Sequence, residues 1–278
     1  MALDEGLQKL TLLNPDARLE VEVLLSHALS KNRAYLFAFP EISLNTKEYT
    51  AFQHFIQQRL SGKPIAYIVG HRDFWSLTLK VNEATLIPRA DTERLVELTL
   101  ELIPKDSPAA ILDLGTGSGA IALALAKERP HWTIDACDLS ADALKVATEN
   151  AQINKITNVT FYQSDWFSAV PLKKYQAIVT NPPYINPTDP HLNQGDLRFE
   201  PQSALVSGQE GLADLQYIIQ HSVDYLNPGG LLLLEHGFDQ SVQVNAILNK
   251  LRFDNVQSWQ DIQGHDRVSG GWLPKGSA

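Results

Sequence analysis

The pattern of hydrophobic and polar residues divides the chain into two parts. In the first part, apolar residues such as Leu19, Val23 and Leu24 recur at helical spacing. Helices are expected around residues 3–13, 17–30 and 46–60. Two β-rich runs follow, IAYIVG and FWSLTLKV, and the polar HRD tripeptide between them is typical of a hairpin turn. We therefore predict a helical domain with a β-hairpin linker over residues 1–85.

The second part, residues 86–278, alternates between strand-like and helical stretches. Asp91 is expected to cap a helix that runs to Ile103. The runs that follow, in chain order, are AAILDL, AIALALAKER, WTIDACD, 141–153, NVTFYQ, QAIVT, 211–225, LLLLEHG, 239–251, 253–260 and 266–273. Repeated strand–helix units predict an α/β domain with a parallel sheet and helices on both of its faces. The last two strands lack a helix between them, so we expect them to pair antiparallel.

Composition and charge narrow the classes of function. Of the 278 residues, 44% are hydrophobic, and no apolar run approaches the ~20 residues that span a bilayer. The start, MALDEGLQKL, lacks the basic end and apolar core of a secretion signal. A single cysteine, Cys137, excludes an internal disulfide and a cysteine-built metal site. We expect a cytoplasmic protein with no metal and no membrane association. Because the net charge is −9 and nucleic-acid binders usually carry a basic face, no direct nucleic-acid binding is expected.

A glycine loop lies where the first strand of the second part hands over to a helix. Its residues are Gly115, Thr116, Gly117, Ser118 and Gly119. Glycines let the backbone approach a ligand closely, and the helix start offers free N–H groups. Asp138 closes the next strand, 23 residues after Gly115, where an acid can accept both hydroxyls of a ribose. Together they predict a cofactor that contains adenosine, although the loop alone could pass for a dinucleotide fingerprint.

Neighbouring residues favour S-adenosylmethionine over NAD. The Asp113 carboxylate would crowd a pyrophosphate, whereas it suits a ligand with an ammonium and a sulfonium. Asp165 and Trp166 offer an acceptor for an adenine amino group and an aromatic face for its ring.

The strand QAIVT ends in Asn181-Pro182-Pro183-Tyr184. Two prolines fix two φ angles and remove two N–H donors, so the loop is stiff and presents acceptors, the Asn181 side-chain oxygen and the Pro182 carbonyl. Two acceptors match the two hydrogens of one –NH2 group, and Tyr184 can lie flat against the planar group that carries it. The motif therefore predicts a holder for a planar amine or amide nitrogen that faces a methyl sulfonium. Alignment alone can contribute ~7–11 kcal/mol to such a transfer.

Motifs spread along the chain resemble the PrmC/HemK-type release-factor glutamine methyltransferases. They are RLEVEVLLSHAL, GKPIAYIVGHRDFWSLTLKVN, TLIPRADTERLVE, LDLGTGSGAIAL, QSDWF, NPPYI, RFEPQSAL and LLLLEHG. NPPY alone is shared with amino-methyltransferases of DNA and RNA, whereas the PRADTE segment and the N-terminal match are much more specific. Ala90 stands where proline is frequent in this family.

The resemblance implies a seven-stranded, Rossmann-like class I methyltransferase domain and a small helical domain that recognises the substrate. Such an enzyme methylates the side-chain amide nitrogen (N5) of the glutamine in the GGQ motif of class-I peptide chain release factors. The cofactor would be S-adenosyl-L-methionine, the product S-adenosyl-L-homocysteine, and the protein a monomer. The residues that carry over as cofactor-binding are Gly115–Gly119, Asp138, Trp166 and Asn181, and those that grip the glutamine amide are Asn181, Pro182, Pro183 and Tyr184. Catalysis would rest on Asn181, Pro182 and Tyr184. Arg89 and Thr92 would lie near the cofactor mouth, and Glu200-Pro201 would shape the same cleft.

Three other functions are compatible with parts of the sequence. A sister family methylates a glutamine of a ribosomal protein and is similar through the catalytic half. Nucleic-acid amino-methylation would use the same NPPY loop but needs a basic surface. A Rossmann dehydrogenase would use the glycine loop and Asp138 for NADH.

Overall fold

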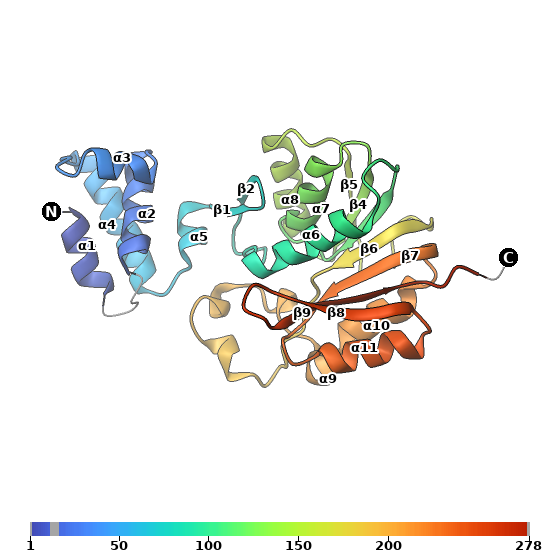
Figure 1. The fold of residues 1–278 in the computed structure, drawn as a ribbon. Coiled ribbons are helices and arrows are strands. Elements are labelled where there is room, and N and C mark those ends of the chain that lie inside the picture. The colour runs from blue at the N-terminus through green and yellow to red at the C-terminus, as the bar shows by residue number, and fades with distance from the viewer. Residues whose placement is uncertain (1, 12–16, 277–278) are drawn as a thin grey trace. The chain divides into compact units, whose positions relative to one another are not determined.

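The computed structural model describes residues 2–11 and 17–276, which form two compact units (Figure 1). One unit comprises Met1–His71 together with His191–Phe199, and the other comprises Arg72–Pro190 together with Glu200–Ala278. The predicted domain boundary between residues 85 and 86 stays a prediction. No helix in the described ranges is both long enough and apolar enough to cross a membrane.

The first unit is helical, as its apolar spacing predicts. Its helices are α1 (Ala2–Leu10), α2 (Ala17–Leu29), α3 (Arg33–Ala38), α4 (Thr46–Leu60) and α5 (Ile65–Val69). Val21 and Leu24 of α2 pack with Phe52 and Ile56 of α4 in a core that excludes water. Asn45 begins α4 with a reciprocal capping box to Glu48, which satisfies donors that the first turn leaves free. Residues 12 and 13 of the predicted first helix lie outside the described ranges.

The β-strand prediction for IAYIVG is wrong, because these residues form helix α5. Pro64 precedes the helix, and Gly70 ends it with a φ of +80°, so the flanking residues favour a helical turn. A hairpin does follow, but it consists of β1 (His71–Phe74) and β2 (Leu77–Lys80). The HRD tripeptide therefore lies within β1, and the turn falls at Trp75, whose φ is +55°.

The second unit is built around a seven-stranded sheet with the order β5-β4-β3-β6-β7-β9-β8. The strands are β3 (Ala110–Leu114), β4 (Thr133–Asp138), β5 (Val159–Gln163), β6 (Tyr175–Thr180), β7 (Leu226–Glu235), β8 (Asp254–Gln260) and β9 (Asp266–Trp272). Strands β3 to β7 pair in parallel, whereas β9 runs antiparallel to both β7 and β8. The predicted fold class is confirmed, including the antiparallel pairing of the last two strands.

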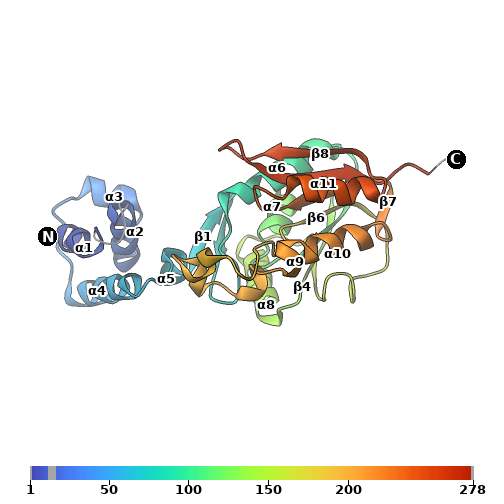
Figure 2. The same ribbon diagram turned by 90° about the horizontal axis from the view of Figure 1, so that it is seen from below.

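Helices cover both faces of this sheet. One face carries α6 (Glu93–Leu102), α7 (Ala120–Glu128) and α8 (Ala141–Ile153). The other carries α10 (Ala213–Ser222) and α11 (Ser241–Lys250), which lie side by side in Figure 2. Successive residues of each strand face opposite sides of the sheet. Ile111 and Leu112 of β3 are an example, because they belong to the two different cores and both are fully buried. The sheet interior is therefore apolar on both sides, which explains why its strands read as continuous hydrophobic runs.

Shorter helical segments occupy the connections. They are η1 (Ala90–Thr92), η2 (Pro190–Asn193), η3 (Leu197–Phe199), η4 (Gln202–Ala204) and α9 (Gly208–Gly211). Asp91 lies inside η1 rather than at a helix cap, so the capping role predicted for it is wrong. Thr92 instead stands at the junction with α6, without a capping hydrogen bond from its side chain.

The register of the sheet brings the predicted site together. Leu114 of β3 pairs with Cys137 of β4 and with Thr180 of β6, and Thr180 pairs with Leu234 of β7. The residues one step further along each strand therefore meet at the same carboxyl edge, where open α/β sheets bind ligands. These residues are Gly115, Asp138, Asn181 and Glu235.

Candidate active site

The glycine loop after β3 adopts a conformation that glycine favours at three positions. The φ angles are +70° at Gly115, +56° at Gly117 and +86° at Gly119. Residues with a side chain rarely adopt such φ angles without strain. Glycine at these three positions therefore allows the backbone conformation of the loop. The loop ends at the start of α7, where Gly119 is the N-cap residue.

Asp113 stabilises this loop through hydrogen bonds. Its Oδ2 accepts hydrogen bonds from the Thr116 hydroxyl at 2.7 Å and from the Ala122 N–H at 3.2 Å. The carboxyl is fully buried, and burial raises its pKa to about 7. Asp113 does not line the pocket described below, and the hydrogen bonds of its Oδ2 hold the glycine loop.

Asp138 joins the end of β4 to the glycine loop. Its Oδ2 accepts from the Gly117 N–H at 2.8 Å, and its Oδ1 accepts from the Ser140 N–H at 2.9 Å. A carboxylate offers about four acceptor positions, so two remain for a ligand. Burial raises the pKa of Asp138, and the two N–H groups oppose this by stabilising the charged form.

A pocket of about 560 Å³ opens beside these residues. Five of the predicted cofactor-binding residues line it, namely Gly115, Gly117, Asp138, Trp166 and Asn181. Thr116, Ser118 and Gly119 are not in its wall. Thr116 and Ser118 are buried. They form hydrogen bonds with Asp113 and Asn150 respectively, so they stabilise the conformation of the loop.

Trp166 stands opposite the first glycine of the loop. A Cβ added to Gly115 would lie 3.4 Å from the Trp166 ring, in ordinary van der Waals contact, so the ring packs beside the loop. The indole Nε1 donates to Asp214 Oδ1 at 3.2 Å, which fixes the ring in the pocket wall. Asp165 and Pro201, both singled out in the sequence, also line the pocket.

The NPPY loop divides its residues between the pocket and the protein interior. Asn181 and Pro183 line the pocket, whereas Pro182 is buried and lies outside its wall. The Asn181 Nδ2 donates to the Thr92 hydroxyl at 3.1 Å. Among the described residues, no hydrogen bond reaches the Asn181 Oδ1, which leaves this oxygen available to a ligand.

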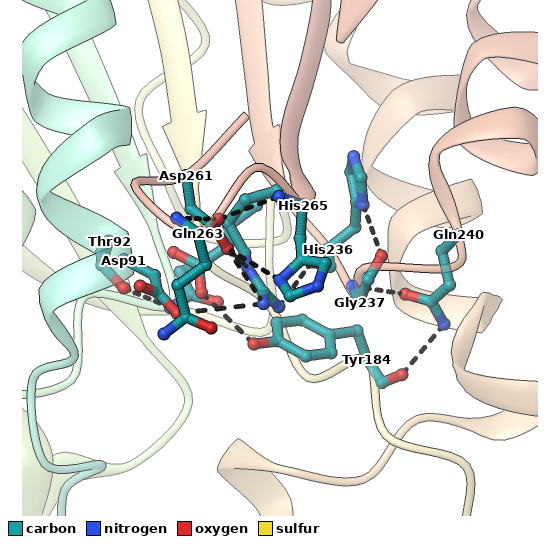
Figure 3. Close-up of polar contacts among 12 residues, drawn as sticks. Asp91, Thr92, Tyr184, His236, Gly237, Gln240, Asp261, Gln263 and His265 are labelled. Carbon is teal, nitrogen blue, oxygen red and sulfur yellow. Dashed lines mark hydrogen bonds and ion pairs between the residues drawn. The ribbon is translucent and has the colours of Figure 1, made fainter. Parts of the chain in front are cut away.

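Tyr184 does not line the pocket. Its hydroxyl donates to Glu235 Oε1 at 3.3 Å, and its carbonyl accepts from Gln240 Nε2 at 3.0 Å. Figure 3 shows Gln240 at the backbone end of Tyr184 and Thr92 near the opposite end. A Cβ at Gly211 would lie only 2.1 Å from the Tyr184 carbonyl, so a glycine is required there. Tyr184 is thus clamped at both ends, and its predicted contact with substrate stays a prediction.

Glu235 was not identified as a site residue from the sequence. It ends β7 and is 1% exposed, and its Oε2 has no hydrogen-bond partner among the described atoms. Burial raises its pKa to about 7, while hydrogen bonding to Thr92 and the charge of Arg267 oppose that rise. An acid at the end of the apolar run LLLLEHG was the available signal, because a buried carboxyl needs a reason to be there.

Three ion pairs complete the surroundings. Arg89 pairs with Glu200, which also accepts from the Ile87 N–H at 3.1 Å. Arg267 lies 3.3 Å from Asp261 and 3.8 Å from Asp91. These contacts anchor the segment before α6, which carries Thr92. The described residues contain no cluster of three or more His, Cys, Asp or Glu that could hold a metal ion.

Comparisons with known proteins agree with this geometry. Residues 91–196 match the family described as Methyltransferase small domain, and residues 1–70 match the PrmC N-terminal domain. A release factor glutamine methyltransferase of Shewanella oneidensis is 50% identical over 98% of this chain and 95% of its own length. The protein of the same description in Escherichia coli is 46% identical over 91% of each chain.

Solved structures support the fold of the catalytic part. A methyltransferase from Pyrococcus furiosus superposes with a TM-score of 0.55 at 16% identity, over 78% of this chain and 97% of that one. Such a likeness shows the architecture alone, whereas the identities of 46% to 50% over nearly the full length show the relationship. The chain belongs to the family of release factor glutamine methyltransferases, as its motifs predicted.

Proposed function

We propose that the protein transfers a methyl group from S-adenosylmethionine to the side-chain amide nitrogen of the glutamine in the GGQ motif of class-I peptide chain release factors. The observation that carries the proposal is the position of Asn181. It lies at the carboxyl end of β6, in the wall of a pocket that Gly115 and Asp138 also line, and its Oδ1 is free to accept. The products are N5-methylglutamine, S-adenosylhomocysteine and a proton.

The pocket fits the proposed cofactor. Its volume of about 560 Å³ lies within the range of small-molecule sites. Asp138 keeps acceptor capacity for ribose hydroxyls, and the bare backbone at Gly115 and Gly117 permits close approach. Trp166 and Asp165 offer an aromatic face and an acceptor to the adenine. When bound, S-adenosylmethionine supplies an electrophilic methyl group, and no metal is required.

The protein's own contribution is to bind and orient the glutamine. An amide nitrogen is a weak nucleophile because its lone pair is conjugated with the carbonyl. The Asn181 Oδ1 in the pocket wall would accept one N–H of the glutamine. The carbonyl of Pro182, a buried residue outside that wall, would accept the other, and together they would draw both N–H groups out of the ideal plane. The prolines hold these acceptors rigidly, so little reorganisation is needed when the reaction occurs. We assign the departing amide proton to water, since the NPPY loop itself offers no general base.

We further propose that residues 1–85 recognise the release factor and that residues 86–278 perform the transfer. The match of residues 1–70 to the PrmC N-terminal domain supports this division. The net charge of −9 favours a monomer and attraction to a basic protein surface. Because release factors act in translation, the cytoplasm is the proposed location.

The test is methyl transfer to purified release factor with labelled cofactor. Label is expected on the wild-type release factor, with the mass shift located at the GGQ glutamine, and none on a variant in which that glutamine is alanine. Parallel reactions with ribosomal protein and with a DNA or RNA oligonucleotide test the related activities. Label that persists on the alanine variant, or that goes mainly to another acceptor, would refute the proposal.

A further inference from the structure

The Asn181 carboxamide has two chemically different ends. Its oxygen accepts hydrogen bonds, and its nitrogen donates them. The proposed function requires the oxygen to face the glutamine amide, because that group carries hydrogens to donate. A rotation of 180° about the last side-chain bond would present a donor instead and would repel the substrate. Something in the protein must therefore select one of the two orientations.

Thr92 makes the contact that selects the orientation. The Asn181 Nδ2 donates to the Thr92 Oγ1 at 3.1 Å, and Thr92 is only 4% exposed, so water does not compete freely for this oxygen. A threonine hydroxyl alone cannot discriminate, since it has one proton to donate and two lone pairs to accept with. If its proton pointed at Asn181, the oxygen end of the carboxamide would be bound just as well.

Glu235 removes this ambiguity. Hydrogen bonding from the Thr92 hydroxyl lowers the pKa of the Glu235 carboxyl and so favours its ionised form. When Glu235 is ionised, above its pKa of about 7, its carboxylate is an acceptor only, so it takes the single proton of Thr92. The Thr92 oxygen then has only lone pairs to offer, and Asn181 must present its nitrogen. The register of β6 and β7 brings Asn181 and Glu235 to the same edge of the sheet.

The Glu235 carboxyl is itself held in place. The Tyr184 hydroxyl donates to Oε1 at 3.3 Å, and the Tyr184 backbone is fixed by Gln240. Arg267 supplies the positive charge that favours the ionised carboxyl in its buried position. Figure 3 shows Thr92 and Gln240 on opposite sides of Tyr184.

We propose that Thr92 and Glu235 are positioning residues that fix the Asn181 carboxamide with its oxygen toward the acceptor nitrogen. Neither side chain lines the pocket, so they act through Asn181 and not on the substrate. The inference rests on the proposed function, and it assigns a role to the PRADTE segment that resemblance alone placed only near the cofactor mouth.

The test compares Thr92→Val with Thr92→Ser. Valine has the shape of threonine but no acceptor, whereas serine keeps the hydroxyl. We expect Thr92→Val to lower kcat about tenfold or more, as for the loss of one orienting hydrogen bond. Thr92→Ser should stay within about threefold of wild type. The dissociation constant for S-adenosylhomocysteine, measured by calorimetry, should be unchanged in both variants, since the Thr92 side chain does not line the pocket.

A second variant, Glu235→Leu, frees the Thr92 proton and should lower kcat in the same way while keeping cofactor affinity. Equal kcat values for the valine and serine variants, in protein that still binds S-adenosylhomocysteine, would overturn the positioning role. So would a loss in Thr92→Val that appears only in the cofactor dissociation constant. Failure of the wild-type enzyme to methylate release factor would instead refute the proposed function, so the two failures are distinguishable.

Discussion

Asp138 Oδ2 accepts a hydrogen bond from the Gly117 N–H at 2.8 Å, so the acid at the end of β4 and the glycine loop at the end of β3 form one unit. The same carboxylate accepts from the Ser140 N–H at 2.9 Å. Asp138 therefore has two functions that the sequence could not separate. It holds the glycine loop, and we propose that its remaining acceptor positions bind the ribose of the cofactor.

Asp138→Ala should weaken binding of S-adenosylhomocysteine. Loss of a charge-assisted hydrogen bond costs about 1.5–3 kcal/mol, which is roughly a 10-fold to 150-fold rise in the dissociation constant. Isothermal titration calorimetry measures it directly. Asp142→Ala is the matched control, because Asp142 also lines the pocket but pairs with Lys145 rather than with the glycine loop. Equal affinities of the two variants would show that Asp138 does not hold the cofactor.

Asn181→Ala should abolish methyl transfer with little effect on folding. The variant loses the acceptor at the pocket wall, and removal of one such preorganised group typically lowers kcat by roughly 100-fold or more. Only one hydrogen bond to Thr92 is lost from the fold, so the free energy of unfolding should fall by about 1 kcal/mol. Label transfer and urea unfolding measure the two effects. Asn186→Ala, five residues further along the same loop, should transfer methyl groups normally, and near-normal turnover by Asn181→Ala would contradict the assigned role.

Most of the second unit could be predicted from the sequence because its signals are local. Each buried strand reads as an apolar run, each helix begins after a turn, and Ser140 and Ala141 mark the start of α8 where it was expected. The family relationship was also visible in the motifs. By contrast, IAYIV has the composition of a strand, and its helix depends on the Pro64 and Gly70 that flank it.

Only those site residues that lie at or directly after the end of a strand could be predicted from the sequence. Gly115, Asp138 and Asn181 do so, and the structure brings them together in one pocket. The contacts of Thr92 and Glu235 with the NPPY loop depend on segments about 50 to 90 residues away in the chain, as the Asn181–Thr92 and Tyr184–Glu235 bonds show. No local pattern reports such a distance. The sequence also could not show that Thr116 and Ser118 are buried while other residues of the same loop line the pocket.

Two glycines of the loop should respond differently to alanine. At Gly117 a Cβ would meet nothing within 4 Å, so Gly117→Ala adds only the strain of φ +56°, about 1–2 kcal/mol. At Gly119 a Cβ would lie 2.9 Å from Leu123 Cδ1, so Gly119→Ala adds overpacking of about 1–3 kcal/mol to a similar strain. Denaturant unfolding should therefore rank Gly119→Ala as the less stable variant.

Cofactor affinity should not follow the same ranking. Gly117 lines the pocket and Gly119 does not, so at a temperature where both variants are folded Gly117→Ala should bind S-adenosylhomocysteine more weakly. Variants of equal stability, or a weaker affinity for Gly119→Ala, would mean that the loop is shaped by other contacts.

The pH dependence of stability provides a test of the buried carboxyl at the end of β7. The Glu235 pKa is raised from 4.5 to about 7, chiefly by burial. Its charged neighbours are Arg267, which opposes the rise, and Asp91, which adds to it, while Thr92 and Tyr184 donate hydrogen bonds. Between these two pKa values the folded protein binds more protons than the unfolded chain at this group. Its contribution to stability is therefore full below about pH 4.5 and is lost as the pH rises through about 7.

Glu235→Gln removes this titration, so the stability of wild type relative to the variant should fall by roughly 2–3 kcal/mol between pH 5 and pH 8. Urea unfolding of both proteins at pH 5, 6, 7 and 8 measures the difference. Asp113, whose pKa is also raised to about 7, is present in both proteins, so its effect cancels in the comparison. Glu101→Gln, at an exposed position of α6, should show no such trend. Parallel curves for wild type and Glu235→Gln would place the Glu235 carboxyl in contact with water, contrary to the buried cluster that orders the NPPY loop.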